Sequence, residues 1–315
     1  MKRSTFLRLA LAASASPGLS RSSHAAVDKP RKLVLIAGQP SHPPMMHEFR
    51  AGTILLEKRL AEVPGLKVDR HELGWVADEK TFDDADAVVC FSDGNGRHPL
   101  LQGEGRLEKA ESLVSGGVGF GCMHFGVEVP KETAGSQFRD WIGGCYENQW
   151  SCNPIWDATF DQFPEHPITR GMTPFTIKDE WYFNMRFTDG FSAEGPNEID
   201  GVKFTPLLVA TPSDETRDGP YVHPKGPYSH IQAEKGRREA VMWAVERPDG
   251  GRGFGFTGGH FHVNWQNDAF RKVILNALCW VAKVDVPAEG IASAPVSEDE
   301  INQNLDDKKP RRAAG

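Results

Sequence analysis

The sequence predicts an α/β fold with a mostly parallel central sheet that is elaborated in its second half. In the first 130 residues, apolar runs that suit buried strands alternate with stretches of helical period. The links between them are short, as they are in open parallel sheets. After residue 130 the alternation loosens, and a polar stretch with several prolines, 212–238, suggests a functional lid or a disordered loop.

The expected elements follow from local patterns. The run 32–38 is apolar throughout and ends in glycine, which is typical of a strand buried on both faces. The segment 267–283 places its apolar residues on one helical face and is the clearest helix. The other expected strands are 66–73, 85–92, 118–126, 173–187, 204–211, 238–246 and 253–259, and the other expected helices are 47–63 and 106–117.

The two ends of the chain differ from this domain, which we place at 32–287. Residues 1–26 carry Lys2, Arg3 and Arg8, a short apolar run and then small residues, the layout of a signal peptide cleaved near Ala25 or Ala26. The sequence therefore predicts export from a bacterium, to the periplasm or the extracellular space. Residues 288–315 are polar and are expected to be an unstructured tail, draped over the domain or free.

Composition limits the possible partners. The formal net charge of −7 over 315 residues argues against a nucleic-acid partner, which would require clustered Lys and Arg. No apolar run approaches the roughly 20 residues that span a bilayer, so no membrane span is expected. The five cysteines form no disulfide framework. Cys90, Cys122 and Cys279 lie in apolar runs and should be buried thiols, whereas Cys145 and Cys152 could pair.

Histidines gather where the expected parallel strands end. His42 and His47 follow the first strand, Asp93 and His98 the third, His124 the fourth, and His260 and His262 the last. Because ligands bind at the carboxyl ends of strands in open α/β sheets, these side chains should line one site. His98, in a glycine-rich turn before a proline, could instead be structural. One of His260 and His262 could serve only to fix the loop.

Carboxylates can complete such a site. Glu180, with Asp179 beside it, lies next to Trp181 and Tyr182 in a strand-like stretch. We predict His124, His260 and Glu180 as the catalytic centre. The same three residues are the expected ligands of a divalent metal, zinc or a similar ion. The same residue types also suit a metal-free acid–base pair, and the spacing matches no local metal motif.

Several ordered motifs resemble the ThuA-like, or trehalose-utilisation, family. They are GQPSH…HEFRAG, SDGNGRHPLLQG, GVGFGCMHFGVEVP, HPITRGM-PFTIKDEWYF and GRGFGFTGGHFHVNWQNDAFRKVILNALCWVAK. The resemblance implies a flavodoxin-like three-layer sandwich related to class I glutamine amidotransferases. In those enzymes a cysteine stands in a G-x-C-x-G elbow between strand and helix. Here His124 takes the elbow position and Cys122 is withdrawn into the strand, so thiol-based amide hydrolysis is not expected.

The resemblance also implies carbohydrate processing, on disaccharides or oxidised (3-keto) glycosides, by a hydrolase or a lyase. Sugar sites combine aromatic faces with carboxylates and amides. The expected substrate-binding residues are His42, His47, Asp93, Trp181, His262, Asn264 and Trp265. Two alternatives remain open: a non-catalytic sugar-binding or scaffold protein with this fold, and a hydrolase that uses Cys122.

Overall fold

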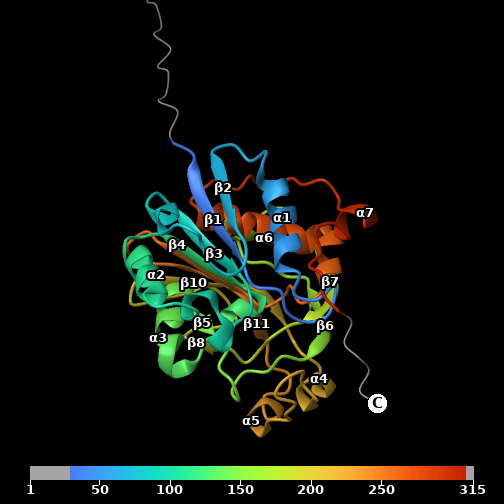
Figure 1. The fold of residues 1–315 in the computed structure, drawn as a ribbon. Coiled ribbons are helices and arrows are strands. Elements are labelled where there is room, and N and C mark those ends of the chain that lie inside the picture. Colours follow the sequence, from blue (N-terminus) through green and yellow to red (C-terminus); the bar gives the residue numbers. More distant parts are fainter. Residues whose placement is uncertain (1–28, 310–315) are drawn as a thin grey trace, which may run out of the picture.

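The computed structural model describes residues 29–309, and the expected signal peptide lies outside them. An eight-stranded sheet in the order β2-β1-β3-β4-β12-β11-β10-β9 forms the centre of the molecule (Figure 1). Its strands are β1 (Arg31–Ala37), β2 (Leu66–His71), β3 (Ala87–Phe91), β4 (Gly119–Met123), β9 (Asn197–Ile199), β10 (Val202–Ala210), β11 (Glu239–Glu246) and β12 (Arg252–Phe256).

The sheet confirms the predicted fold class. β2, β1, β3, β4 and β12 are mutually parallel, whereas β11, β10 and β9 continue the sheet antiparallel. The antiparallel strands and the ribbons beyond them are the elaboration expected after residue 130. As a result, the carboxyl ends of β1, β3, β4 and β12 meet at one edge, because parallel strands share a direction.

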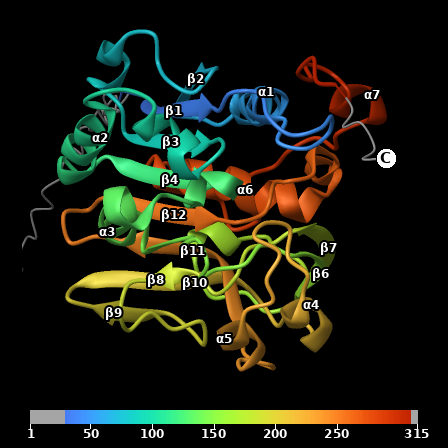
Figure 2. The same cartoon turned by 60° about the horizontal axis from the view of Figure 1, so that its bottom comes forward.

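Helices cover both faces of the sheet (Figure 2). The helices are α1 (Phe49–Leu60), α2 (Arg106–Ser115), α3 (Lys131–Ile142), α4 (Asp214–Asp218), α5 (Ser229–Gln232), α6 (Asp268–Val281) and α7 (Glu298–Ile301). On β1, Leu33 and Leu35 belong to one core with α1 and α6, while Val34 and Ile36 belong to a second core with α2 and α3. Such burial on both faces explains the continuous apolar runs.

Two small two-stranded sheets lie beyond the central sheet and bring further residues to the edge where the carboxyl ends of the parallel strands meet. β6 (Ile155–Phe160) pairs with β7 (Phe175–Glu180), and β5 (Gly144–Cys145) pairs with β8 (Arg186–Phe187). The sequence predicted one strand over 173–187, but the chain leaves β7 after Glu180 and enters β8 at Arg186. The polar stretch 212–238 contains the short helices α4 and α5, which lie together at one end of the molecule (Figure 1).

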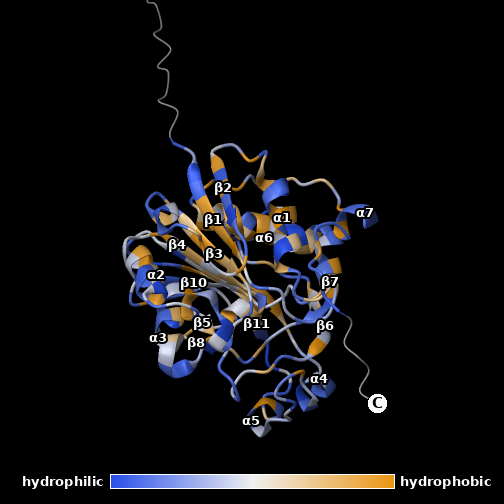
Figure 3. Ribbon diagram, viewed as in Figure 1, coloured by the Kyte–Doolittle hydropathy of each residue, from blue (hydrophilic) through white to orange (hydrophobic). Residues whose placement is uncertain are grey.

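The C-terminal segment differs from the unstructured tail that its polarity predicted. Residues 288–309 run across the domain and include α7. Ile291, Val296 and Ile301 are buried in the core that contains α1 and α6. Isolated apolar residues in a polar segment carry no periodic signal, so their burial is known only from the folded domain. Figure 3 shows that the ribbon of α7 is mostly hydrophilic.

The five cysteines are all free and buried, so Cys145 and Cys152 form no disulfide. Burial raises the pKa of Cys90 and Cys279 to about 12, and it raises the pKa of Cys122 well above its ordinary value. Protonated thiols are poor nucleophiles. The arrangement therefore gives no support to a hydrolase that uses Cys122. Within residues 29–309, the helices are all too short or too polar to cross a membrane.

Two buried histidines share one structural role. His98 and His166 each precede a proline at the start of a 3₁₀ turn, and each Nδ1 accepts a hydrogen bond from the backbone N–H two residues later, at 3.2 and 3.1 Å. Burial lowers the pKa of His98 to about 3 and that of His166 to about 4. His98 is therefore the structural residue that its position before Pro99 suggested.

These two histidines should make the fold sensitive to mild acid. In the unfolded chain their pKa returns to about 6.5, so below that pH the unfolded state binds more protons. The free energy of unfolding should therefore fall between pH 6.5 and 4, by up to about 1.4 kcal/mol per pH unit for each histidine. Urea unfolding at pH 7, 6 and 5 with a chelator would measure it. His166→Asn should keep the turn, because the asparagine side chain can accept the same hydrogen bond from the backbone. It should lower the slope of the free energy of unfolding against pH by the equivalent of one proton. An unchanged slope would contradict a lowered pKa for His166 in the folded protein.

Candidate metal centre

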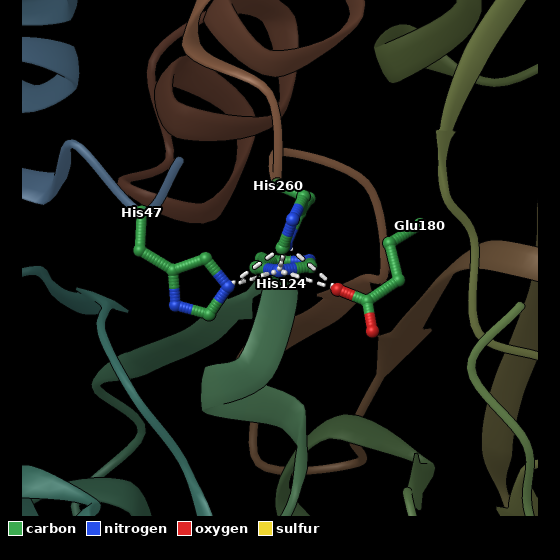
Figure 4. A group of neighbouring side chains, drawn as sticks. All are labelled: His47, His124, Glu180 and His260. Atoms are coloured by element: carbon green, nitrogen blue, oxygen red, sulfur yellow. Dashed lines mark hydrogen bonds and ion pairs between the residues drawn. The ribbon is translucent and has the colours of Figure 1, made fainter. Parts of the chain in front are cut away.

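Four side chains from four separate segments converge at the shared edge of the sheet (Figure 4). His47 precedes α1, His124 follows β4, His260 follows β12, and Glu180 is the last residue of β7. All four are almost completely buried. The structure thus brings together the three residues predicted as the centre, His124, His260 and Glu180, and adds His47, which was expected to bind substrate.

The atoms that could act as ligands lie close together. Nε2 of His47 is 2.9 Å from Nε2 of His124 and 3.0 Å from Nδ1 of His260. Nδ1 of His260 is 3.3 Å from Nε2 of His124 and 2.7 Å from Oε2 of Glu180. Oε2 of Glu180 lies 3.7 Å from Nε2 of His124. Three nitrogens and one oxygen therefore surround a single point.

The backbone around these residues is constrained. His47 and His124 are in the left-handed region, with φ of 47° and 55°. That conformation is uncommon for residues other than glycine, and it clusters at functional sites. In His124 it produces the elbow between β4 and the following 3₁₀ turn that the sequence indicated. Left-handed backbone therefore aims two of the four side chains into the cluster.

The glycine pair before His260 also has a steric reason. A Cβ on Gly258 would lie 2.5 Å from the Trp181 ring, and Gly259 has φ of 110°. Gly258 is required by the close approach of the ring, and Gly259 by its backbone angle. The pair lets the chain turn sharply past Trp181 and present His260 to Glu180.

Hydrogen bonds on the far side of each ring fix the tautomers of two histidines. Nδ1 of His124 donates to the carbonyl oxygen of Thr257 at 2.9 Å, because that carbonyl can only accept. Nδ1 of His47 donates to the carboxylate of Asp93, also at 2.9 Å. Burial lowers the pKa of both imidazoles well below 6.5, so both are neutral at pH 7. Their Nε2 atoms consequently carry lone pairs.

Those lone pairs provide the test of whether a metal fits. Two neutral imidazole nitrogens cannot hydrogen-bond to each other without a proton, yet the two Nε2 atoms are 2.9 Å apart. A cation between them would turn this repulsion into two coordinate bonds. Ligands at 2.0–2.1 Å around a tetrahedral ion are about 3.4 Å apart, and the separations here bracket that value at 2.7–3.7 Å. The set of three imidazoles and one carboxylate suits a divalent transition metal.

The outer contacts follow the pattern of metal sites, in which ligands are held by a second hydrogen bond. Asp93 holds His47 and also accepts from Ser41 Oγ at 2.8 Å. The His42 ring stacks on His47, with centroids 3.6 Å apart, and reaches solvent. Asn153 donates to Oε1 of Glu180 at 2.9 Å, which leaves Oε2 for the cluster. His42 and Asp93, predicted to bind substrate, thus lie in contact with His47.

Asp179 holds the segment that carries His260. Its carboxylate, which is fully buried, accepts from the backbone N–H groups of Gly259 at 2.7 Å and His260 at 3.1 Å. It also accepts from Glu180 N at 2.8 Å and from Nδ2 of Asn264 at 3.0 Å. Asn264, predicted as a substrate-binding residue, is instead part of this support.

Three predicted substrate-binding residues lie away from any open surface. Trp181 and Trp265 are fully buried in the hydrophobic core, so neither ring offers a face to a sugar. His262 is buried too, with its backbone N–H bonded to Met45 O at 2.9 Å, and burial lowers its pKa to about 4. The sequence placed these residues at a rim because they flank site residues. In the structure His262 and Trp265 are directed inward by the turn between β12 and α6, and Trp181 by the end of β7.

Sequence reasoning missed Glu128 and the tyrosines beside the cluster. Tyr182 places its hydroxyl 3.3 Å from Nε2 of His124, and its ring lies 5.3 Å from that of Tyr146. Glu128, bridged to Tyr146 in the backbone, accepts a hydrogen bond from Asn95 at 3.0 Å. Burial, with the charge of Glu180, raises the pKa of Glu128 to about 7. The sequence feature that could have indicated Glu128 is its position as the single acidic residue in the apolar stretch after the elbow at His124.

Lys308 is a further residue that sequence reasoning missed. Its Nζ donates to the carbonyl oxygens of Met46 and His47, at 2.7 and 2.9 Å, and lies 3.2 Å from the buried carboxylate of Glu48. The C-terminal segment therefore ties down the loop that carries His47. A basic residue in a polar tail gives no sequence signal for such a contact.

Comparisons with known proteins agree with this architecture. The model of a family described as trehalose utilisation (ThuA) matches residues 41–281. No curated protein matches the chain in sequence. Among solved structures, a ThuA-like protein from Bacteroides uniformis ATCC 8492 shares 16% identity and a TM-score of 0.55, over 84% of this chain and 96% of that one. A ThuA-like protein from Parabacteroides merdae ATCC 43184 shares 16% identity and a TM-score of 0.53, over 88% and 100%. At such identities the likeness shows the fold alone.

Proposed function

Because the chain belongs to the trehalose-utilisation (ThuA) family, we propose that it is a metal-dependent enzyme that processes carbohydrates. Its proposed substrates are disaccharides or their oxidised 3-keto forms, cleaved by hydrolysis or elimination. The family description supports the substrate class. The observation that carries the chemistry is the convergence of His47, His124, His260 and Glu180, in which two Nε2 atoms with lone pairs lie 2.9 Å apart.

The proposed roles follow from the contacts. His47, His124, His260 and Glu180 would hold a divalent ion, which would supply a Lewis acid for a carbonyl or glycosidic oxygen. Tyr182, with its hydroxyl at the edge of the cluster, would position a substrate oxygen. Glu128, whose pKa of about 7 leaves it partly ionised at neutral pH, would accept or return the proton. Asp93 and Asn153 would keep two ligands in orientation.

The alternative is a sugar-binding or scaffold protein whose metal is structural. One observation favours it: four protein ligands complete the shell of a tetrahedral zinc ion, whereas catalytic zinc keeps a position open. An ion that accepts five or six ligands, held by the same four residues, would keep one or two coordination positions open for substrate. The two proposals therefore differ in turnover and in metal preference.

One experiment separates them. The purified protein is stripped with a chelator, reloaded separately with Zn²⁺, Mn²⁺ or Fe²⁺, and incubated with trehalose, other disaccharides and their 3-keto derivatives. We expect product with at least one ion, loss of product on chelation, and recovery on reloading. Sugar binding without product under all loadings would establish the alternative, and activity that survives complete metal removal would reject a metal-dependent mechanism.

We also propose that the protein is exported, on the basis of residues 1–26 alone. Expression in a Gram-negative host followed by fractionation should place it in the periplasm. Intact mass should show cleavage near Ala25 or Ala26. A full-length chain that stays in the cytosol would overturn this proposal.

A further inference from the structure

A groove of about 360 Å³ lies beside the candidate metal centre and is lined in part by Asp93, which holds His47. It is lined by residues that follow β1, β2 and β3 and by the turn that leads into α2. The chain leaves β1 toward β2 on one side and returns to β3 on the other, so the strand order reverses at this point. Ligands of open α/β sheets bind at such reversals, and the volume lies within the usual range for small-molecule sites.

Two guanidinium groups, against the single carboxylate of Asp93, give the groove a net positive charge in an acidic protein. Arg97 is largely exposed, with 77% of its side chain accessible, and its nearest carboxylate is Asp93 at 3.7 Å. Asp93 already accepts from Ser41 and His47. Arg106 lies over the Trp75 ring, 5.1 Å from the centroid, and donates to Pro99 O at 3.2 Å. Its guanidinium is therefore held in place, while that of Arg97 is free to turn toward a ligand.

An apolar side chain stands at the edge of the same groove. Leu73 is 62% exposed and adopts a left-handed backbone conformation, with φ of 61°. Gln39, also in the groove, donates to the Leu73 carbonyl at 3.1 Å and supports this conformation. Leu73 therefore offers an apolar side chain to a ligand at the rim of the groove.

We propose that this groove binds a small organic anion, a phosphate monoester or a carboxylate carried on a sugar-sized body. Arg97 and Arg106 bind the anionic group, because guanidinium groups match phosphate and carboxylate oxygens in pairs. Leu73 contacts the carbon body. Asp93, on the groove wall, connects this ligand with His47. The site does not depend on the proposed enzyme activity or on a bound metal.

Calorimetric titration at low salt tests the proposal with three probes: inorganic phosphate, glucose 6-phosphate and gluconate, with glucose as the neutral comparison. We expect glucose 6-phosphate or gluconate to bind at least about tenfold more tightly than glucose, in both metal-free and metal-loaded protein. Whichever anion binds more tightly identifies the group that the arginines accept. Binding that requires the metal would place the anion at the metal centre instead and would overturn the proposal.

Variants localise the site. Arg97→Gln changes an exposed side chain and should weaken anion binding at least about tenfold; Arg106→Lys, which keeps the charge but loses the paired geometry, should weaken it less. Leu73→Asn suits the left-handed backbone and should weaken glucose 6-phosphate or gluconate while leaving inorganic phosphate unchanged. The matched control is Arg238→Gln, a half-buried arginine that pairs with Glu194 outside the groove. Equal binding by the Arg97 and Arg238 variants, or no preference for an organic anion over inorganic phosphate, would overturn the proposal.

Discussion

Protein carrying His124→Ala should fold and should bind zinc at least about 100-fold more weakly than the wild type. In the wild type, Nε2 of His124 lies within 3.7 Å of the ligand atoms of His47, His260 and Glu180. The alanine variant therefore lacks one of the four proposed metal ligands. Second-sphere changes already cost 10–100-fold in metal affinity, and a lost ligand costs more. Competition with a chromophoric chelator measures the affinity, and metal analysis after dialysis should find about one ion per wild-type chain.

Two further variants make that result specific. His124→Asn retains a side chain that tolerates the left-handed backbone at φ 55°, so it separates loss of the ligand from backbone strain. His71→Ala removes a histidine on β2, outside the cluster, and should leave zinc binding unchanged. Zinc should raise the melting temperature of the wild type and of His71→Ala but not that of the His124 variants. Equal zinc affinity in all four proteins would contradict a metal site at this position.

Replacing Asp179 with alanine should lower the free energy of unfolding by about 4 kcal/mol. The carboxylate is fully buried and accepts four hydrogen bonds, three of them from backbone N–H groups. Alanine would leave these donors buried without a partner, and each such group costs about 1–3 kcal/mol unless the structure relaxes. Because two of the donors belong to Gly259 and His260, metal affinity should fall as well.

Urea unfolding of the metal-free protein measures this effect. The matched control is Asp157→Ala, an exposed aspartate on the adjacent strand β6, which should change stability by less than about 0.5 kcal/mol. Asp179→Asn keeps the shape and one acceptor oxygen, so its stability should lie between those of the alanine variant and the wild type. If Asp179→Ala and Asp157→Ala unfold at the same urea concentration, the support of His260 by Asp179 is not important for the fold.

Local patterns were sufficient to predict most of the fold, because buried strands and amphipathic helices leave a periodic signal in the sequence. Strands β1 to β4 and helices α1, α2 and α6 lie where those patterns placed them, whereas α3 and β9 were not predicted. The break between β7 and β8 and the packing of residues 288–309 were not predictable in this way. Both depend on contacts with distant parts of the chain, such as the bridge from Cys152 to Phe183 and the bonds from Lys308 to the His47 loop.

The sequence by itself determined the composition of the site edge: histidines and a carboxylate after strands that share a direction, with a glycine pair where the chain must turn. Only the tertiary structure decided which of them meet. His47 enters the cluster while its neighbour His42 faces solvent, and Trp181 is in the core while Glu180 reaches His260. Backbone angles and packing set side-chain direction, and a one-residue step along a strand reverses it. The types and order of the residues therefore indicate which edge of the sheet carries the site, whereas the tertiary structure determines which side chains form it.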